Sequence, residues 1–256
     1  MTGFNLRGAY AIYVRELMRA MRTAFQSILA PVLTTSLYFI VFGAAIGGRM
    51  QAVDGVNYAA FIVPGLLLLT LLSESTSNAS FGIYMPRFTG TIYELLSAPV
   101  GVAETLVGFV GAAATKSLIL AAIILLTATF FVDYRIEHPV LAVGFIMLVA
   151  SAFSLFGFIL GIWADNFEKL GIIPMLILMP LTFLGGTFYS IDMLPEPWRS
   201  VALFNPIVYL VSGLRWTFYG TSDVNIWVSF GLTVAFLAIC VAAITIIFRT
   251  GWRLRT

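Results

Sequence analysis

The sequence predicts an all-α integral membrane protein: six transmembrane helices, an N-terminal amphipathic interfacial helix, and a re-entrant outer segment between helices five and six. Of its 256 residues, 60% are hydrophobic and only 10% are charged, too few charges to cover a soluble domain of this length. The mean hydropathy is +0.99. The apolar residues form blocks of about 20 residues or more, enough to cross about 30 Å of hydrocarbon. Residues 1–256 are expected to form a single domain, because no polar linker or repeat divides them.

The first expected element, residues 4–22, is an amphipathic helix and not a span. At about 100° per residue, apolar side chains fall in one arc and charged ones opposite, with Ile12 as the exception. The arc consists of Leu6, Tyr10, Tyr13, Val14, Leu17, Ala20 and Met21, and the charged side of Arg7, Arg15, Glu16, Arg19 and Arg22. Such a helix lies in the membrane interface with its arginines among anionic head groups. Packing on a soluble partner is the alternative, which the adjacent membrane block disfavours.

Six apolar blocks of transmembrane length follow. They cover approximately residues 24–46, 58–80, 104–132, 140–163, 170–190 and 226–248. Pro174 and Pro180 interrupt the fifth block, which membrane helices tolerate where neighbours satisfy the freed carbonyls. The first block is longer than the roughly 7–15 residues of a signal peptide's apolar region, so a cleaved signal is not expected.

Between the fifth and sixth blocks, residues 184–225 are too apolar for an ordinary loop. Turn-forming residues divide this stretch into short pieces, namely Gly185, Gly186, Pro195, Asn205 and Pro206. We therefore expect one or two short helices that dip into the outer leaflet, with aromatic side chains such as Trp198 at interfacial depth.

Basic residues set the expected orientation, because cytoplasmic loops carry an excess of Lys and Arg. With six spans both termini share one side, and that side carries ten of the 14 Lys and Arg residues. The other side carries Arg49, Arg135, Arg199 and Arg215. Both termini are therefore expected in the cytoplasm, in a bacterial-type inner membrane.

Several chemistries are disfavoured by what the sequence lacks. It contains no Gly-x-x-x-x-Gly-Lys-Ser/Thr loop for nucleotide phosphates, so no ATPase activity or bound cofactor is expected of the chain itself. The single histidine, His138, and single cysteine, Cys240, predict neither a metal site nor catalytic residues. The net charge of +2 does not indicate nucleic-acid binding. A membrane enzyme would need a cluster of acids or a Ser/His arrangement on one face, and none stands out.

Glu74 and Lys116 are the ionisable residues expected inside spans, and such groups are functional candidates. Both lie toward the cytoplasmic ends of their spans, where they either pair with each other or where Lys116 extends to the interface. A secondary transporter or channel without an ATPase is the alternative function. It predicts midplane charges or an internal repeat, and the sequence shows neither. Gly157 and Gly161, four residues apart, allow close approach of another helix.

Aromatic residues near the outer ends of two spans could line a path for an amphiphile, with ordinary packing as the alternative. They are Tyr38, Phe39, Phe42, Phe183 and Phe188.

The cytoplasmic stretch 84–100 predicts a short capped helix. Thr91 can cap it, Glu94 lies in its first turn, and Pro99 ends it. Its apolar side chains are Ile92, Leu95 and Leu96. Such a helix suits docking into a groove on another protein, and a connector resting on the bilayer is the alternative.

Three stretches resemble the permeases of ABC-2 type transporters. One is YELLSAPV, residues 93–100, and another runs from Gly157 to Pro174. The strongest is FLGGTFYSIDMLP, residues 183–195, continued by Trp198, Asn205-Pro206 and Arg215. Together with the six spans and the amphipathic start, the resemblance covers nearly the whole chain.

The resemblance implies an exporter driven by ATP, in which two permeases, a homodimer or a related pair, bind two cytoplasmic ATPase subunits that hold ATP and Mg²⁺. The helix around residues 91–98 would be a coupling helix in an ATPase cleft, and the turn 164–169, with Asp165 and Glu168, a second contact. Segment 184–220 would close the outer end of a path formed by the first, second and fifth spans at the permease interface. The cargo implied is amphiphilic or hydrophobic, such as a drug, a lipid or a lipid-linked saccharide.

Overall fold

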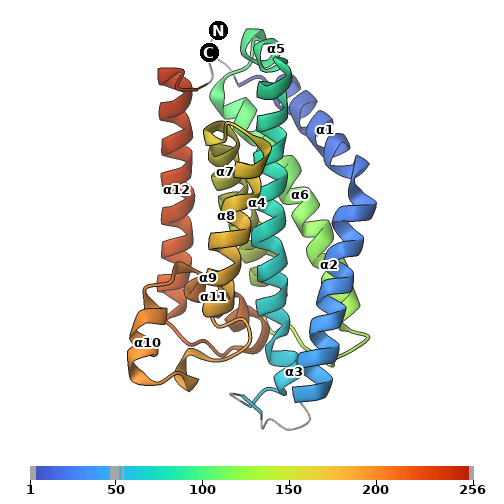
Figure 1. Ribbon diagram of the computed structural model, residues 1–256, viewed down its shortest axis with the longest axis vertical. Helices are drawn as coiled ribbons and strands as arrows, with labels where there is room; N and C mark the ends of the chain where they lie inside the picture. The colour runs from blue at the N-terminus through green and yellow to red at the C-terminus, as the bar shows by residue number, and fades with distance from the viewer. Residues whose placement is uncertain (1–3, 47–51, 54, 254–256) are drawn as a thin grey trace.

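The computed structural model describes residues 4–46, 52–53 and 55–253, apart from the side chains of residues 26, 44–46, 95 and 96. Long helices run side by side along its longest axis (Figure 1). In chain order the helices are α1 Leu6–Arg22, α2 Ala24–Tyr38, η1 Phe39–Ile46, α3 Tyr58–Phe61, α4 Val63–Thr89, α5 Ile92–Ser97, α6 Val102–Ala128, α7 Pro139–Trp163, α8 Phe167–Ile173, η2 Pro174–Leu178, α9 Met179–Leu184, η3 Ile191–Met193, α10 Glu196–Leu203, α11 Pro206–Tyr219 and α12 Ile226–Thr250.

The all-α membrane class is confirmed by the length and composition of these helices. Within the described residues, five helices are long and apolar enough to cross a membrane, or up to seven if each of two bent pairs is one span. The expected six-span arrangement lies within that range. Three ends differ from the expected ones: α4 continues to Thr89 instead of ending near residue 80, α6 ends at Ala128 instead of residue 132, and the fifth span ends with α9 at Leu184 instead of residue 190.

Helix α4 lies at the centre of the bundle and packs most closely against α7 (Figure 1). Gly157 and Gly161 of α7 face it without side chains, and a Cβ at either position would lie 2.2 Å from a backbone oxygen, that of Thr76 or Ser80. Of the most apolar 18-residue stretch in each of α4 and α7, 72% is buried, against 22% in α12. The core therefore lies along α4 and α7, and the apolar surface of α12 faces outward.

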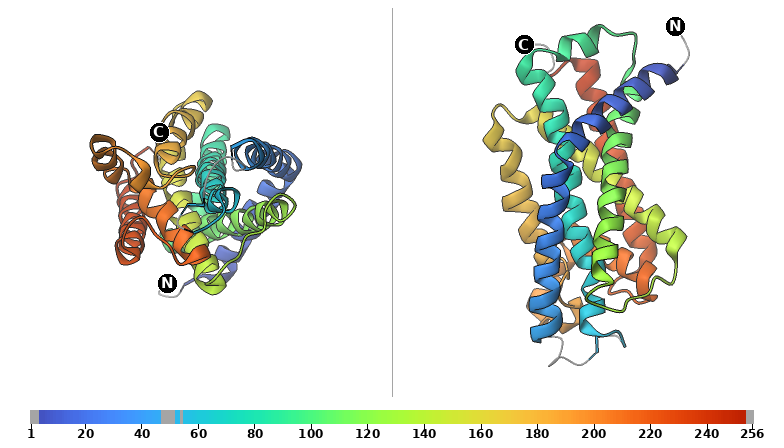
Figure 2. Two further views of the ribbon diagram at one scale, coloured as in Figure 1. Left: turned by 90° about the horizontal axis from the view of Figure 1, so that it is seen from below. Right: turned by 90° about the vertical axis from the view of Figure 1, so that its right-hand side faces the viewer.

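Helix α1 is tilted by 58° from the helix that follows it and lies across α6 (Figure 2). Four side chains of α1 are buried against the bundle, namely Ala9, Ile12, Glu16 and Ala20. Ile12, the exception in the predicted arc, packs where Gly108 leaves room. Leu6 and Tyr10 of that arc are 74% and 68% exposed, so these side chains are open to lipid or to a partner, and the interfacial location stays a prediction.

The segment between the fifth and last spans folds into η3, α10 and α11 at the end of the molecule opposite α5 (Figure 1). Helices α10 and α11 are bent by 88° at Phe204-Asn205, because Pro206 begins a new helix that Asn205 caps. Helix α1 begins and α12 ends at the same end as α5 (Figure 1).

Candidate functional site

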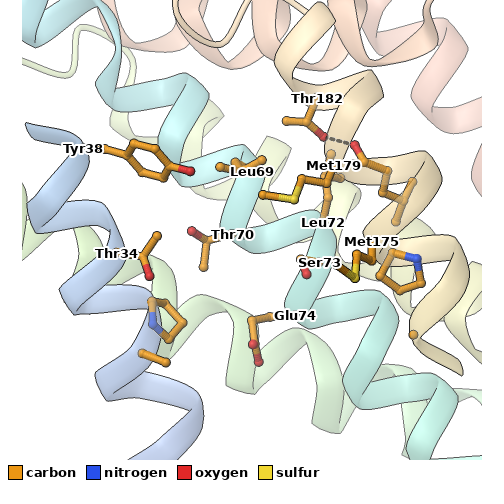
Figure 3. Close-up of a pocket in the computed structure, with 15 residues that line it drawn as sticks. Thr34, Tyr38, Leu69, Thr70, Leu72, Ser73, Glu74, Met175, Met179 and Thr182 are labelled. Atoms are coloured by element: carbon orange, nitrogen blue, oxygen red, sulfur yellow. Dashed lines mark hydrogen bonds between the residues drawn. The ribbon is translucent and has the colours of Figure 1, made fainter. Parts of the chain in front are cut away.

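A hollow of about 460 Å³ lies between α2, α4 and the broken helix α8–η2–α9 (Figure 3). These elements correspond to the first, second and fifth predicted spans. The lining side chains are Ala30, Pro31, Thr34, Tyr38, Leu69, Thr70, Leu72, Ser73, Glu74, Gly171, Pro174, Met175, Leu178, Met179 and Thr182. Met175 and Met179 are 69% and 45% exposed, so the hollow opens onto the surface. We call it the lateral groove.

Two prolines shape the broken wall of the lateral groove. Pro174 begins the π-helix η2, and Pro180 lies in the first turn of α9. Neither has a backbone N–H to donate to the preceding turn, and the π turn is wider than an α turn. Met175 and Met179 face the groove from this wall (Figure 3). Their flexible, polarizable side chains adapt to ligands of different shape.

Among the described residues that line the lateral groove, Glu74 is the one charged side chain. Its Oε2 lies 3.6 Å from Nζ of Lys116, and the side chains are 26% and 8% exposed. The pairing left open by the sequence is therefore present. The hydroxyls of Thr70 and Thr182 donate within their own helices, to carbonyl oxygens four residues earlier, at 3.2 and 2.6 Å.

A second hollow, of about 550 Å³, lies on the other side of Glu74. It shares Ala30, Pro31 and Glu74 with the lateral groove, but it also has two cations in its lining, Arg19 and Lys116. Arg19 Nε donates to Glu16 at 2.7 Å. We call it the basic hollow. Glu74 thus separates a mostly apolar groove from a basic one.

Four of the five aromatic residues proposed for a path form one cluster at the end of the lateral groove away from α5 (Figure 1). Tyr38 lies 6.0 Å from Phe42, 6.5 Å from Phe183 and 5.6 Å from Phe188, measured between ring centroids. Phe42 and Phe188 stack at 4.5 Å. Phe39 differs: it is buried on another side of the helix and stacks with Phe131 at 5.9 Å. The structure therefore does not bring Phe39 to the aromatic cluster of Tyr38, Phe42, Phe183 and Phe188.

At the end of the molecule where α1 begins, α5 follows α4 directly, because Gly90 adopts φ +79° and reverses the chain. Glu94 is exposed, and the Thr91 hydroxyl bonds to that of Thr89 at 3.0 Å. Ile92 corrects one expectation: it is buried in a cluster that includes Ile12, because α5 packs on the bundle, so it cannot dock into a partner. The side chains of Leu95 and Leu96 lie outside the described residues, and their part in docking stays a prediction.

The second expected contact, the turn 164–169, faces α5 across a hollow. Asp165 accepts hydrogen bonds from Lys169 at 2.7 Å and Arg253 at 2.8 Å, and these hold the pKa of its carboxyl below the usual range, the Lys169 bond most strongly. Asn166 caps α8 through Lys169 N–H, and Glu168 lies in the exposed first turn.

A polar hollow of about 250 Å³ lies between α5 and this turn. Arg87 and Arg253 line it, and sequence reasoning did not identify either as a site residue. Arg87 donates to the carbonyls of Gly161 at 2.8 Å and Ile162 at 2.6 Å, which would otherwise be unpaired at the C-terminus of α7. Arg253 bonds to Asp165 and Trp163. Their partners are about 75–90 residues away in sequence, so no local pattern marks them.

At the end of the molecule opposite α5, the expected gate residues shape the turns between α9 and α11. Asn205 Nδ2 donates to the Leu181 carbonyl at 2.7 Å, which ties the start of α11 to α9. Pro195 precedes α10 and Pro206 begins α11. Gly186 has φ +83°, and a Cβ on Gly185 would lie 2.9 Å from Ile207. Their role as a gate stays a prediction.

Arg215 of α11, which sequence reasoning used only as a basic and family-matching residue, is buried at the centre of this same end. It donates to Asp223 Oδ2 at 2.5 Å and to the Gly186 carbonyl at 2.6 Å. Its guanidinium lies 3.8 Å from the ring centroid of Phe61, before α4. Ser190 donates to the other oxygen of Asp223. One arginine thus joins α11, the turn at Gly186 and the end of α3.

Fold and site together define a polytopic membrane protein with a lateral groove between three spans and a polar hollow at the end where α1 begins and α12 ends (Figure 1). Residues 8–219 match the model of the family described as ABC-2 type transporter. The chain belongs to this family, and the resemblance found in the sequence is confirmed.

Curated relatives agree with this assignment. The chain is 36% identical over 227 residues to the inner membrane transport permease YadH of Escherichia coli strain K12, with 89% of each chain covered. It is 23% identical over 231 residues to nodulation protein J of Rhizobium leguminosarum bv. viciae, covering 90% of this chain and 89% of that protein. It is 25% identical to nodulation protein J of Rhizobium meliloti strain 1021, covering 96% and 92%. The chain is therefore a membrane permease of the ABC transporter type.

Proposed function

We propose that this permease belongs to an ATP-driven exporter in which two copies pair and bind two cytoplasmic ABC ATPase subunits, which hold ATP and Mg²⁺. The cargo is an amphiphilic or hydrophobic molecule, such as a drug, a lipid or a lipid-linked saccharide, taken from the cytoplasm or the inner leaflet. The observation that carries the proposal is the lateral groove, because it opens at the surface between the three spans expected to form the path.

The seam between the two copies is expected to include α2. Four large apolar side chains recur on it at four-residue spacing, which places them on one face. Phe25, Leu29, Leu33 and Leu37 are 81%, 41%, 61% and 59% exposed. A second copy against this face would close the open side of the lateral groove and form a path between the copies.

Coupling would pass through α5 to the groove. Helix α5 is joined to α4 by the single turn at Gly90 and fixed to the bundle by Ile92. The opposite part of α4 carries Leu69, Thr70 and Glu74 along the groove. A force that ATPase closure applies to α5 would therefore move one wall of the path. Arg87 and Arg253 beside α5 support a cytoplasmic location for this end and for both termini.

Exposed Glu94 provides the test, because a charge reversal there changes the docking surface without disturbing the core. The permease is co-expressed with the ABC ATPases of its own genome, and the purified complex is assayed in lipid. We expect Glu94→Lys to reduce ATP turnover or formation of the complex at least tenfold. Glu196→Lys, the same change in an exposed residue at the opposite end, is the matched control and should leave both unchanged. Wild-type turnover in the Glu94→Lys complex would refute the coupling role of α5. The proposed function would be refuted if none of these ABC ATPases bound the wild-type permease.

A further inference from the structure

We propose that the lateral groove binds amphiphilic organic cations, with Glu74 accepting the cationic head and the aromatic cluster receiving the apolar part. This rests on the proposed function, which requires a cargo path but leaves its chemistry open. The inference comes from the charge of the groove and from the way Glu74 is paired.

Charge complementarity indicates the head group. Glu74 is the one charged side chain among the described residues lining the lateral groove, whereas Lys116 lines the basic hollow and not the groove. A ligand in the groove therefore meets a carboxylate first. In a site of low dielectric constant such a charge strongly favours a cation over a neutral molecule or an anion of the same size.

The pairing of Glu74 leaves it able to accept a second cation. Its 3.6 Å separation from Lys116 exceeds the roughly 2.7–2.9 Å of a charge-assisted hydrogen bond, so the two are close without being tightly bonded. A carboxylate has about four acceptor positions, and Glu74 remains 26% exposed. A ligand cation can thus share Glu74 with Lys116 or replace it.

The far end of the groove suits the apolar part of the same ligand. Tyr38 both lines the groove and belongs to the aromatic cluster, and Figure 3 shows it well apart from Glu74 along α2 and α4. Met175 and Met179 form an adaptable wall between them. Aromatic faces also attract organic cations through their ring quadrupole. An anionic amphiphile would instead find its partners, Arg19 and Lys116, in the basic hollow.

The test uses two ions of nearly identical shape and opposite charge, tetraphenylphosphonium and tetraphenylborate. Equilibrium binding is measured on the full chain in lipid nanodiscs, with empty nanodiscs subtracted. We expect the wild type to bind tetraphenylphosphonium more tightly, and Glu74→Gln to weaken that binding about tenfold, or about 1.4 kcal/mol, without weakening tetraphenylborate binding. Glu196→Gln, the same change outside the groove, is the matched control.

Lys116 variants separate recognition from folding. Lys116→Met removes the competitor for Glu74 and should tighten tetraphenylphosphonium binding several-fold. Glu74→Gln combined with Lys116→Met leaves no unpaired charge and should remain weak. Equal losses for both ions in Glu74→Gln, unchanged cation binding, or preference of the wild type for tetraphenylborate would each overturn the inference. A permease that gives one of these results and still supports ATP turnover with its ATPase would retain the proposed function.

Discussion

Arg215 and Asp223 form an ion pair whose side chains are 1% and 4% exposed, which makes them the most deeply buried of the ion pairs described at the end opposite α5. A buried pair contributes little net stability over apolar residues, but removing one partner leaves the other charge unpaired. Nothing in the local sequence predicts this pair, because it depends on a turn after α11 that brings Asp223 back against the helix. The same holds for Arg87, whose partners lie on another helix.

We expect Arg215→Met to lower the free energy of unfolding by about 3–5 kcal/mol, because Asp223 would remain charged and buried. Thermal unfolding of the purified permease in detergent checks this. Arg199→Met is the control at the same end: Arg199 pairs with Asp192 at 2.6 Å, but the side chains are 45% and 63% exposed, so the loss should stay below about 1 kcal/mol. Equal effects of the two substitutions would contradict the account of Arg215.

At the scale of elements, block length and hydropathy predict which segments cross the membrane but not where each helix stops. Helix α4 runs on to Thr89 because Arg87 finds partners on α7 that the sequence does not reveal. Short helices between the fifth and last spans are predictable from Gly and Pro, because these residues constrain the backbone locally, and short helices do form there. Predicting that the first, second and fifth spans form a path required the family resemblance as well, since periodicity does not tell which spans are neighbours. Ile92 was misjudged because burial against α1 and α6 is a tertiary property.

The contact between α4 and α7 depends on two small residues, so we expect Gly157→Ala to destabilise the bundle by roughly 1–3 kcal/mol through overpacking. A Cβ there would lie 2.2 Å from the Thr76 carbonyl oxygen. Because this oxygen belongs to the backbone of α4, the clash is relieved only if the two helices move apart. The measurement is thermal unfolding in detergent. Gly144→Ala, on the same helix with nothing within 4 Å of its Cβ, should be neutral or slightly stabilising. Unchanged thermal stability in Gly157→Ala would show that α4 and α7 are not so closely packed.

At the scale of the whole molecule, α5 and the short helices η3, α10 and α11 lie at opposite ends of one bundle, with the lateral groove between them (Figure 1). This arrangement suits the proposed path, which an ATPase bound at the α5 end would open. We propose that two copies meet along α2 and that ATP on the partner subunits changes this seam.

Cross-linking between copies tests that claim most directly. Cys240 is the single cysteine, so a Cys240→Ala background accepts one new thiol at a chosen position. Leu33→Cys, on the exposed face of α2, should form a disulfide between copies in the ATP-free complex, and the yield should fall when ATP is trapped. Val234→Cys, 47% exposed on α12 at the far side of the bundle, is the control and should not cross-link. A complex that hydrolyses ATP but never cross-links through Leu33→Cys, or does so equally with and without ATP, would contradict the account.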